Sequence, residues 1–139
     1  MNSVSDDFKD LLVAGGAGKF GATEGWSIAI GHQPDEPDEC ITVYEVPGRV
    51  TEETFDGMNE IEELPVQVRV RATSFQRAFE KSKQVREILN RNSTNIESIP
   101  NDTCYLSISI ATPSYPLGGR DSQNRFTRIQ TFNAHRKEA

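Results

Sequence analysis

The chain has 139 residues, of which 35% are hydrophobic and 26% are charged, and its formal net charge is −6. This length fits one domain with a core of its own, whereas the low apolar fraction predicts a thin core and substantial loops. No apolar run approaches the roughly 18 residues of a membrane-spanning helix, and the N-terminus lacks a basic-then-apolar signal pattern. We therefore expect a soluble protein with no membrane partner that stays in the compartment where it is made.

Charge is unevenly distributed along the chain. Residues 34–64 hold eleven acidic residues and one basic residue, whereas residues 65–139 hold twelve basic and six acidic residues. An acidic segment followed by a basic one predicts two surfaces of opposite sign on one small domain.

The first third of the chain predicts one short helix and two strands. Ser3 or Ser5 is placed to cap a helix that runs to about Val13, and a glycine-rich turn follows it. Residues 26–31 and 40–46 are rich in β-branched and aromatic residues, which is typical of strands. The proline-rich acidic turn between these two strands predicts a hairpin connection.

The middle of the chain predicts a loop, a strand and a long helix. Residues 50–63 are polar and acidic and predict a long loop, which in a compact domain is usually functional or disordered. Residues 64–72 alternate apolar and polar side chains, so they predict a strand with one buried face. Thr73 then caps a helix to about Arg91, and Gln76 completes a capping box. The expected buried side of this helix comprises Phe75, Ala78, Phe79, Val85, Ile88 and Leu89.

Two further strands complete the expected fold. One begins at Cys104, and the other covers about residues 125–134, where neither face is wholly apolar, so we expect an edge strand or an interface. Residues 135–139 are interpreted as a tail. The order of elements predicts one α+β domain over residues 1–139. Its sheet is mostly antiparallel and five-stranded, with a long helix and a short N-terminal helix packed on one face.

Residues able to support catalysis or metal binding are sparse. Pairing His32 with Cys40 as base and nucleophile is one option, but Cys40 lies in an apolar strand and nothing marks an oxyanion hole. The two cysteines stand 64 positions apart, which is not the spacing of a metal site. We therefore predict no enzyme activity, no metal site and no cofactor.

Two other binding functions remain open from the residues alone. Nucleic-acid binding is suggested by the basic residues of the second half, but the whole protein is acidic and lacks the interleaved aromatic residues of a stacking platform. A monomeric binding or regulatory domain would show the same order of elements. A solvated or partner-facing basic surface is the better interpretation of the second half.

Three segments together resemble the minor capsid and tail terminator (tail completion) proteins of tailed bacteriophages. The first is residues 26–48, in which a proline–aspartate turn precedes the sequence ITVYE. The second is residues 65–72, PVQVRVRA, ahead of the long helix, and the third is residues 117–133, which contains GGRD and ends in FN. In this order the segments cover most of residues 8–136, although the length and acidity of residues 50–63 depart from the family's pattern.

The resemblance implies a structural virion protein rather than an enzyme. Such proteins form a ring, usually a hexamer, that terminates the tail tube and joins it to the head or neck, with DNA passing through the lumen. The implied partners are further copies of the chain, the tail tube protein and a neck or head-completion protein. The implied location is the virion, after assembly in the host cytoplasm. Another head–tail connector or neck protein is the nearest alternative.

The candidate contact residues are charged. In a ring, the acidic segment of one copy is expected to approach the basic segment of the next in a head-to-tail arrangement. The loop before the last strand is expected to present Arg120 and Asp121 to a neighbour. The full set of candidates comprises Asp35, Glu36, Asp38, Glu39, Arg69, Arg71, Arg120, Asp121, Arg125 and Arg128.

Overall fold

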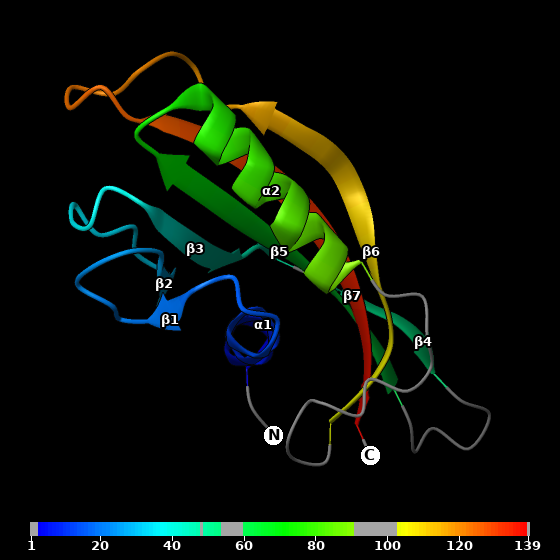
Figure 1. The fold of residues 1–139 in the computed structure, drawn as a ribbon. Coiled ribbons are helices and arrows are strands. Elements are labelled where there is room, and N and C mark those ends of the chain that lie inside the picture. The colour runs from blue at the N-terminus through cyan, green and yellow to red at the C-terminus, as the bar shows by residue number, and fades with distance from the viewer. Residues whose placement is uncertain (1–2, 48, 54–59, 91–102, 139) are drawn as a thin grey trace.

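The computed structural model describes residues 3–47, 49–53, 60–90 and 103–138. Within these ranges it contains two helices and seven strands, and it confirms the predicted α+β class (Figure 1). In chain order the elements are α1 (Val4–Ala14), β1 (Lys19–Phe20), β2 (Ser27–Ile30), β3 (Cys40–Glu45), β4 (Arg49–Glu53), β5 (Glu60–Ala72), α2 (Phe75–Leu89), β6 (Thr103–Pro116) and β7 (Phe126–Glu138).

The described strands form one mixed sheet in the order β1-β2-β3-β5-β7-β6, and β4 pairs with β5 beside this path. β1, β2 and β3 are parallel to one another, whereas the remaining pairs are antiparallel. The sheet is therefore larger than the five strands predicted, and the predicted hairpin between β2 and β3 is wrong. The turn over residues 31–39 returns the chain to the start of β2, so that Cys40 pairs with Ser27 and Ile41 with Ile28.

The predicted acidic loop is wrong where the structure describes it. Residues 50–53 and 60–63 belong to β4 and β5 and pair with each other in antiparallel register. Residues 54–59 lie outside the described residues. An acidic composition concealed these strands, because charged residues are depleted in strands and the composition of a segment does not reveal its pairing partner.

The last strand is longer and more central than its sequence predicted. β7 runs to Glu138, so the prediction of a tail from residue 135 is wrong. It lies between β5 and β6, so it is not an edge strand. Arg128 and Gln130, which made one face look polar, are buried together with their apolar neighbours Ile129 and Phe132.

One hydrophobic core joins both helices to a single face of the sheet, as predicted (Figure 1). Phe8 of α1 packs edge-to-face on Phe132 of β7, with ring centroids 6.3 Å apart. Full burial of each such side chain stabilises the fold by about 1.5–3 kcal/mol. The core comprises mainly Phe8, Leu11, Leu12, Ile28, Ile41, Val43, Val66, Val68, Val70, Val85, Leu89, Tyr105, Ile108 and Phe132.

The long helix α2 buries a different face from the one that the sequence predicted. Its N-cap is Ser74 rather than Thr73, and the Ser74 hydroxyl accepts a hydrogen bond of 3.1 Å from the Arg77 backbone N–H. Its buried residues are Ala78, Ser82, Val85 and Leu89. Phe75 and Phe79, which were predicted to be buried, are 48% and 46% exposed, because the buried stripe passes to one side of them.

Candidate functional site

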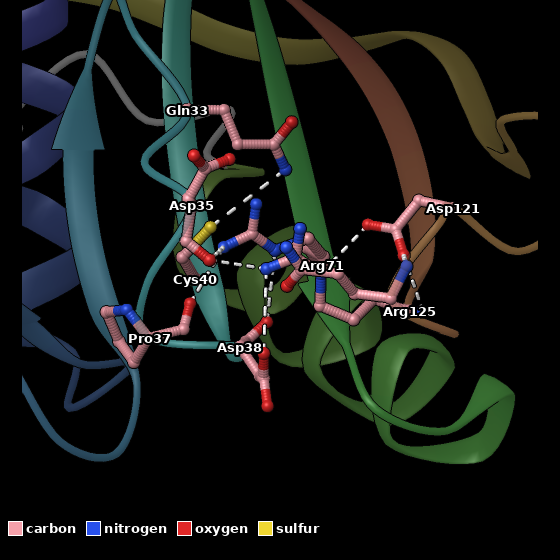
Figure 2. A network of polar contacts seen from close by, with 9 residues as sticks. Gln33, Asp35, Pro37, Asp38, Cys40, Arg71, Asp121 and Arg125 are labelled. Carbon is pink, nitrogen blue, oxygen red and sulfur yellow. Dashed lines mark hydrogen bonds and ion pairs between the residues drawn. The ribbon is translucent and has the colours of Figure 1, made fainter.

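Two of the predicted contact residues, Arg71 and Arg125, are buried and connect three separate segments (Figure 2). The segments are the acidic turn of residues 33–39, the end of β5 and the loop before β7. We call this set of contacts the arginine network. It forms because the antiparallel register of β3 and β5 places Cys40 opposite Arg71, so the turn that precedes Cys40 lies over the arginine.

Arg71 is bound by main-chain carbonyl groups of the acidic turn. Its Nη2 donates to the carbonyl oxygens of Pro37 at 2.7 Å and Asp35 at 3.3 Å, and its Nε donates to that of Asp38 at 3.1 Å. The guanidinium group therefore fixes the path of the turn. The carboxylates of Asp35 and Asp38, in contrast, lie on exposed residues.

Arg125 closes the same network from the opposite side. Its Nη1 donates to the Asp35 carbonyl oxygen and lies 3.5 Å from a carboxylate oxygen of Asp38, while its Nε donates to Asp121 Oδ2 at 2.8 Å. Asp121 Oδ1 also accepts the backbone N–H groups of Gln123 and Arg125, each at 2.9 Å. The bond from the Arg125 backbone N–H is the main cause that holds the pKa of Asp121 below its ordinary value of 3.8.

These contacts change the expected charge pattern. We predicted that the acidic surface of one copy approaches the basic surface of the next, and part of each also meets within one molecule. A further ion pair, between Glu39 and Arg77 of α2, joins the acidic turn to the helix. Because Arg71 and Arg125 are buried with acceptors of their own, a partner cannot contact them without opening the network. The carboxylate of Asp121 is likewise bound by its own chain.

The other basic candidates are not part of this network. Arg69 lies on the sheet face away from the helices, where its Nε donates to Gln67 Oε1 at 2.8 Å and its guanidinium group stacks on Tyr44. Arg120 is exposed and stacks on the ring of Phe126. Arg128 is buried under α2, so these three candidates do not form one surface.

Phe75 and Phe79 of α2, which the sequence pattern assigned to the core, lie at the surface. Arg128 donates to Ser114 Oγ at 2.9 Å and to its carbonyl oxygen at 3.0 Å. The same guanidinium group lies 5.5 Å from the ring centroid of Phe75 and 5.3 Å from that of Phe79. These cation–π contacts hold both exposed rings in place. The sequence contained one indication of this surface, which is that Phe75 and Phe79 share a helical face with the charged residues Lys83 and Arg86.

A buried polar contact connects α1 to the sheet. The Tyr105 hydroxyl donates to Asp7 Oδ2 at 2.5 Å, and Arg136 Nη1 lies 3.9 Å from the same oxygen. Burial raises the pKa of Asp7 above its ordinary value, and burial also raises the pKa of Tyr105. We interpret this contact as structural, because Asp7, Tyr105 and Arg136 are all buried where α1 meets the sheet.

The described residues contain no group of three or more His, Cys, Asp or Glu side chains arranged to hold a metal ion. Cys40 is buried and contacts Gln33 and Thr42, each at 3.9 Å. None of the described helices combines the length and apolar character that crossing a membrane requires.

Comparison with known proteins identifies a family and solved structures with a similar fold. The family model described as "Bacteriophage tail terminator protein" matches residues 10–137 of the chain. Among solved structures, the chain is similar to one described as "Virion of native gene transfer agent (GTA) particle", with a TM-score of 0.49 and 13% identity, covering 81% of this chain and 78% of that chain. No curated protein sequence matches the chain.

Proposed function

The chain belongs to the bacteriophage tail terminator family, and from this premise we propose that it forms a ring that terminates the tail tube. Family membership makes it a structural protein of the virion tail and confirms the family predicted from the sequence. The match over residues 10–137 is the observation that carries the proposal. The expected ring is a hexamer that joins the tube to the head or neck and lets DNA pass through its lumen.

The shape of the subunit supports a head-to-tail ring. One edge of the sheet ends in β1 and β2, near the acidic turn, whereas the opposite edge is β6, near the aromatic residues of α2. A two-fold contact would place like surfaces together, whereas a head-to-tail contact pairs unlike ones and closes into a ring if the rotation permits. The proposed partners are therefore other copies, the tail tube protein and a neck or head-completion protein, which meet in the host cytoplasm during assembly.

Specific binding of nucleic acid is less well supported than ring formation. Arg71, Arg125 and Arg128 are each at most 8% exposed, and each has acceptors within the chain. Phosphate binding depends on exposed basic side chains that release counterions. DNA is therefore proposed only as a non-specific passenger through the lumen.

Native mass spectrometry and negative-stain microscopy of the purified chain test the proposal. We expect closed rings of one subunit number that also cap the ends of isolated tail tubes. Binding to arbitrary duplex DNA at several salt concentrations provides the comparison with a nucleic-acid-binding module. A chain that stays monomeric at high concentration, in low and high salt and beside tail tubes, would overturn the ring.

A further inference from the structure

We propose that neighbouring copies in the ring meet through an aromatic stripe on α2 of one copy and an acid-rimmed groove beside β1 and β2 of the next. The aromatic stripe comprises Phe75, Phe79, Lys83 and Arg86. The acid-rimmed groove comprises mainly Phe20, Ile28, Ile30, Pro34, Glu36 and Pro37. This inference rests on the proposed function, because it names the contact by which that ring would close.

The aromatic stripe has an apolar N-terminal end and a basic C-terminal end. Its residues follow one another at positions i, i+4, i+8 and i+11, so they share one face of α2. Glu80 and Glu87 lie on a different face of the helix, and the stripe itself therefore contains no carboxylate. Aromatic and arginine side chains are enriched at the centres of protein interfaces.

The stripe is preorganised by its contacts with β7. The rings of Phe75 and Phe126 meet edge-to-face with centroids 6.0 Å apart. Arg128, fixed by its bonds to Ser114, lies against the rings of Phe75 and Phe79. A surface that is already ordered loses less conformational freedom when a partner binds.

A small cavity beside the stripe contains an unpaired acceptor. The cavity has a volume of about 190 Å³ and lies between α2 and the strands β6 and β7, where its lining includes Phe79, Ser82 and Gln130. Gln130 is 3% exposed, and its amide oxygen has no hydrogen-bond partner. Since a buried acceptor without a donor is unfavourable, the cavity points to a donor supplied by the bound neighbour.

The acid-rimmed groove has the opposite character. Its volume is about 490 Å³, its wall is built by apolar residues of β1, β2 and the proline-rich turn, and Phe20 is 57% exposed. The exposed carboxylates of Asp35 and Glu36 lie on that turn, and Glu36 lines the groove. His32, which has a ring N–H to donate, also lines the groove.

Two copies of the chain are complementary at these two surfaces in apolar character and in charge. The groove offers apolar walls for the rings of Phe75 and Phe79, while its acidic rim is complementary to Lys83 and Arg86. The two surfaces lie toward opposite edges of the sheet, as a head-to-tail contact requires. Because the rim charges are exposed, they act mainly on orientation and on the rate of association.

Charge reversal on each surface tests the contact. The double variants Lys83→Glu with Arg86→Glu, and Asp35→Lys with Glu36→Lys, place like charges across the contact. We expect each variant alone to associate at least about tenfold more weakly, because like-charge juxtaposition is strongly unfavourable at an interface. A mixture of the two variants restores every contact when the copies alternate, so it is expected to assemble again. Native mass spectrometry reports both the loss and the alternating composition.

A matched control separates this contact from general effects of charge. Glu80→Lys with Glu87→Lys makes the same change in net charge as the Asp35 and Glu36 variant, but on another face of α2, and is expected to assemble like the unmodified chain. Recovery in the mixture also shows that the variants are folded, which circular dichroism checks independently.

The possible results distinguish the contact from the ring. Rings that form normally from the Lys83 and Arg86 variant would overturn the contact and leave the proposed function intact. Normal rings that no longer bind tail tubes would assign the stripe to a different protein and overturn its assignment to a second copy. An unmodified chain that never associates would overturn both proposals.

Discussion

The arginine network and the aromatic stripe both contain basic groups, but they differ in what surrounds those groups. Arg71 is buried and donates to three carbonyl groups of the acidic turn, and Arg125 is buried against Asp35, Asp38 and Asp121. Lys83 and Arg86 are exposed beside two exposed rings and an unpaired buried amide oxygen. The first region has satisfied its hydrogen bonds within the chain, whereas the second retains groups that a partner can still satisfy. The comparison therefore supports the proposal that the first region serves folding and the second serves assembly.

The largest expected difference concerns the stability of the monomer. Arg71→Met keeps most of the aliphatic stem but removes the guanidinium donors that bind the carbonyl groups of the acidic turn. We expect it to lower the free energy of unfolding by about 3 kcal/mol. Lys83→Met is the matched control, and its effect is expected to stay within about 0.5 kcal/mol because the side chain is exposed. Urea unfolding followed by circular dichroism measures both. Equal losses would break the distinction between the two regions.

A smaller, pH-dependent effect is expected for Asp121. A group whose pKa is lowered by folding contributes stability above its unfolded pKa and loses that contribution as the pH falls through the folded value. The pKa of Asp121 is held below 3.8, so Asp121→Asn is expected to destabilise the protein at neutral pH and to have progressively less effect below pH 3.8. Asp35→Asn keeps the carbonyl acceptor of the network and serves as the control. Thermal melting from neutral to acid pH measures the difference, and a constant effect of Asp121→Asn would contradict it.

Two glutamines extend the comparison, because one amide oxygen is paired and the other is not. Gln130→Leu removes the unpaired acceptor, so we expect the monomer to be unchanged or more stable by up to about 1 kcal/mol, while association weakens several-fold. Gln67→Leu removes the acceptor of Arg69 Nε on the other sheet face and is expected to destabilise the monomer without weakening association. Melting temperature and native mass spectrometry provide the two measurements. Stronger association of Gln130→Leu would contradict a donor from the neighbour.

Periodicity predicted the parts of the fold that depend on local sequence. The alternating strand of residues 64–72 followed from spacing, both helices followed from spacing and capping residues, and the α+β class followed from the order of elements. Strand direction depends on which distant segments pair, so the parallel contact of β2 and β3 was missed. The same limit applies to β4, whose pairing with β5 is not visible in an acidic composition.

The candidate site was predicted only in part, for a related physical reason. Sequence identifies a basic residue but not its partners, and Arg71 finds its acceptors more than 30 positions away in the chain. Phe75 and Phe79 show the opposite error. A helical repeat indicates that residues share a face, but only the packing of the sheet decides whether that face is covered. Gln130 gave no sequence signal, because an unpaired acceptor is a property of its surroundings.

Salt provides the weakest perturbation and separates the two regions without a mutation. Exposed charges are screened beyond about 8–10 Å at physiological ionic strength. Added salt is therefore expected to slow association, because it screens Lys83 and Arg86 of the stripe from Asp35 and Glu36 at the groove. Each exposed pair contributes only about 0–1 kcal/mol, so a completed ring is expected to dissociate less readily than the slower assembly suggests. The bonds of Arg71 go to neutral carbonyl groups in a buried site, where screening is weak. The melting temperature of the monomer is therefore expected to change little over the same range of salt. Light scattering records the rate of assembly and calorimetry the melting. Association that is independent of salt would remove the charged rim from the proposed contact and leave the aromatic rings and the groove to account for it.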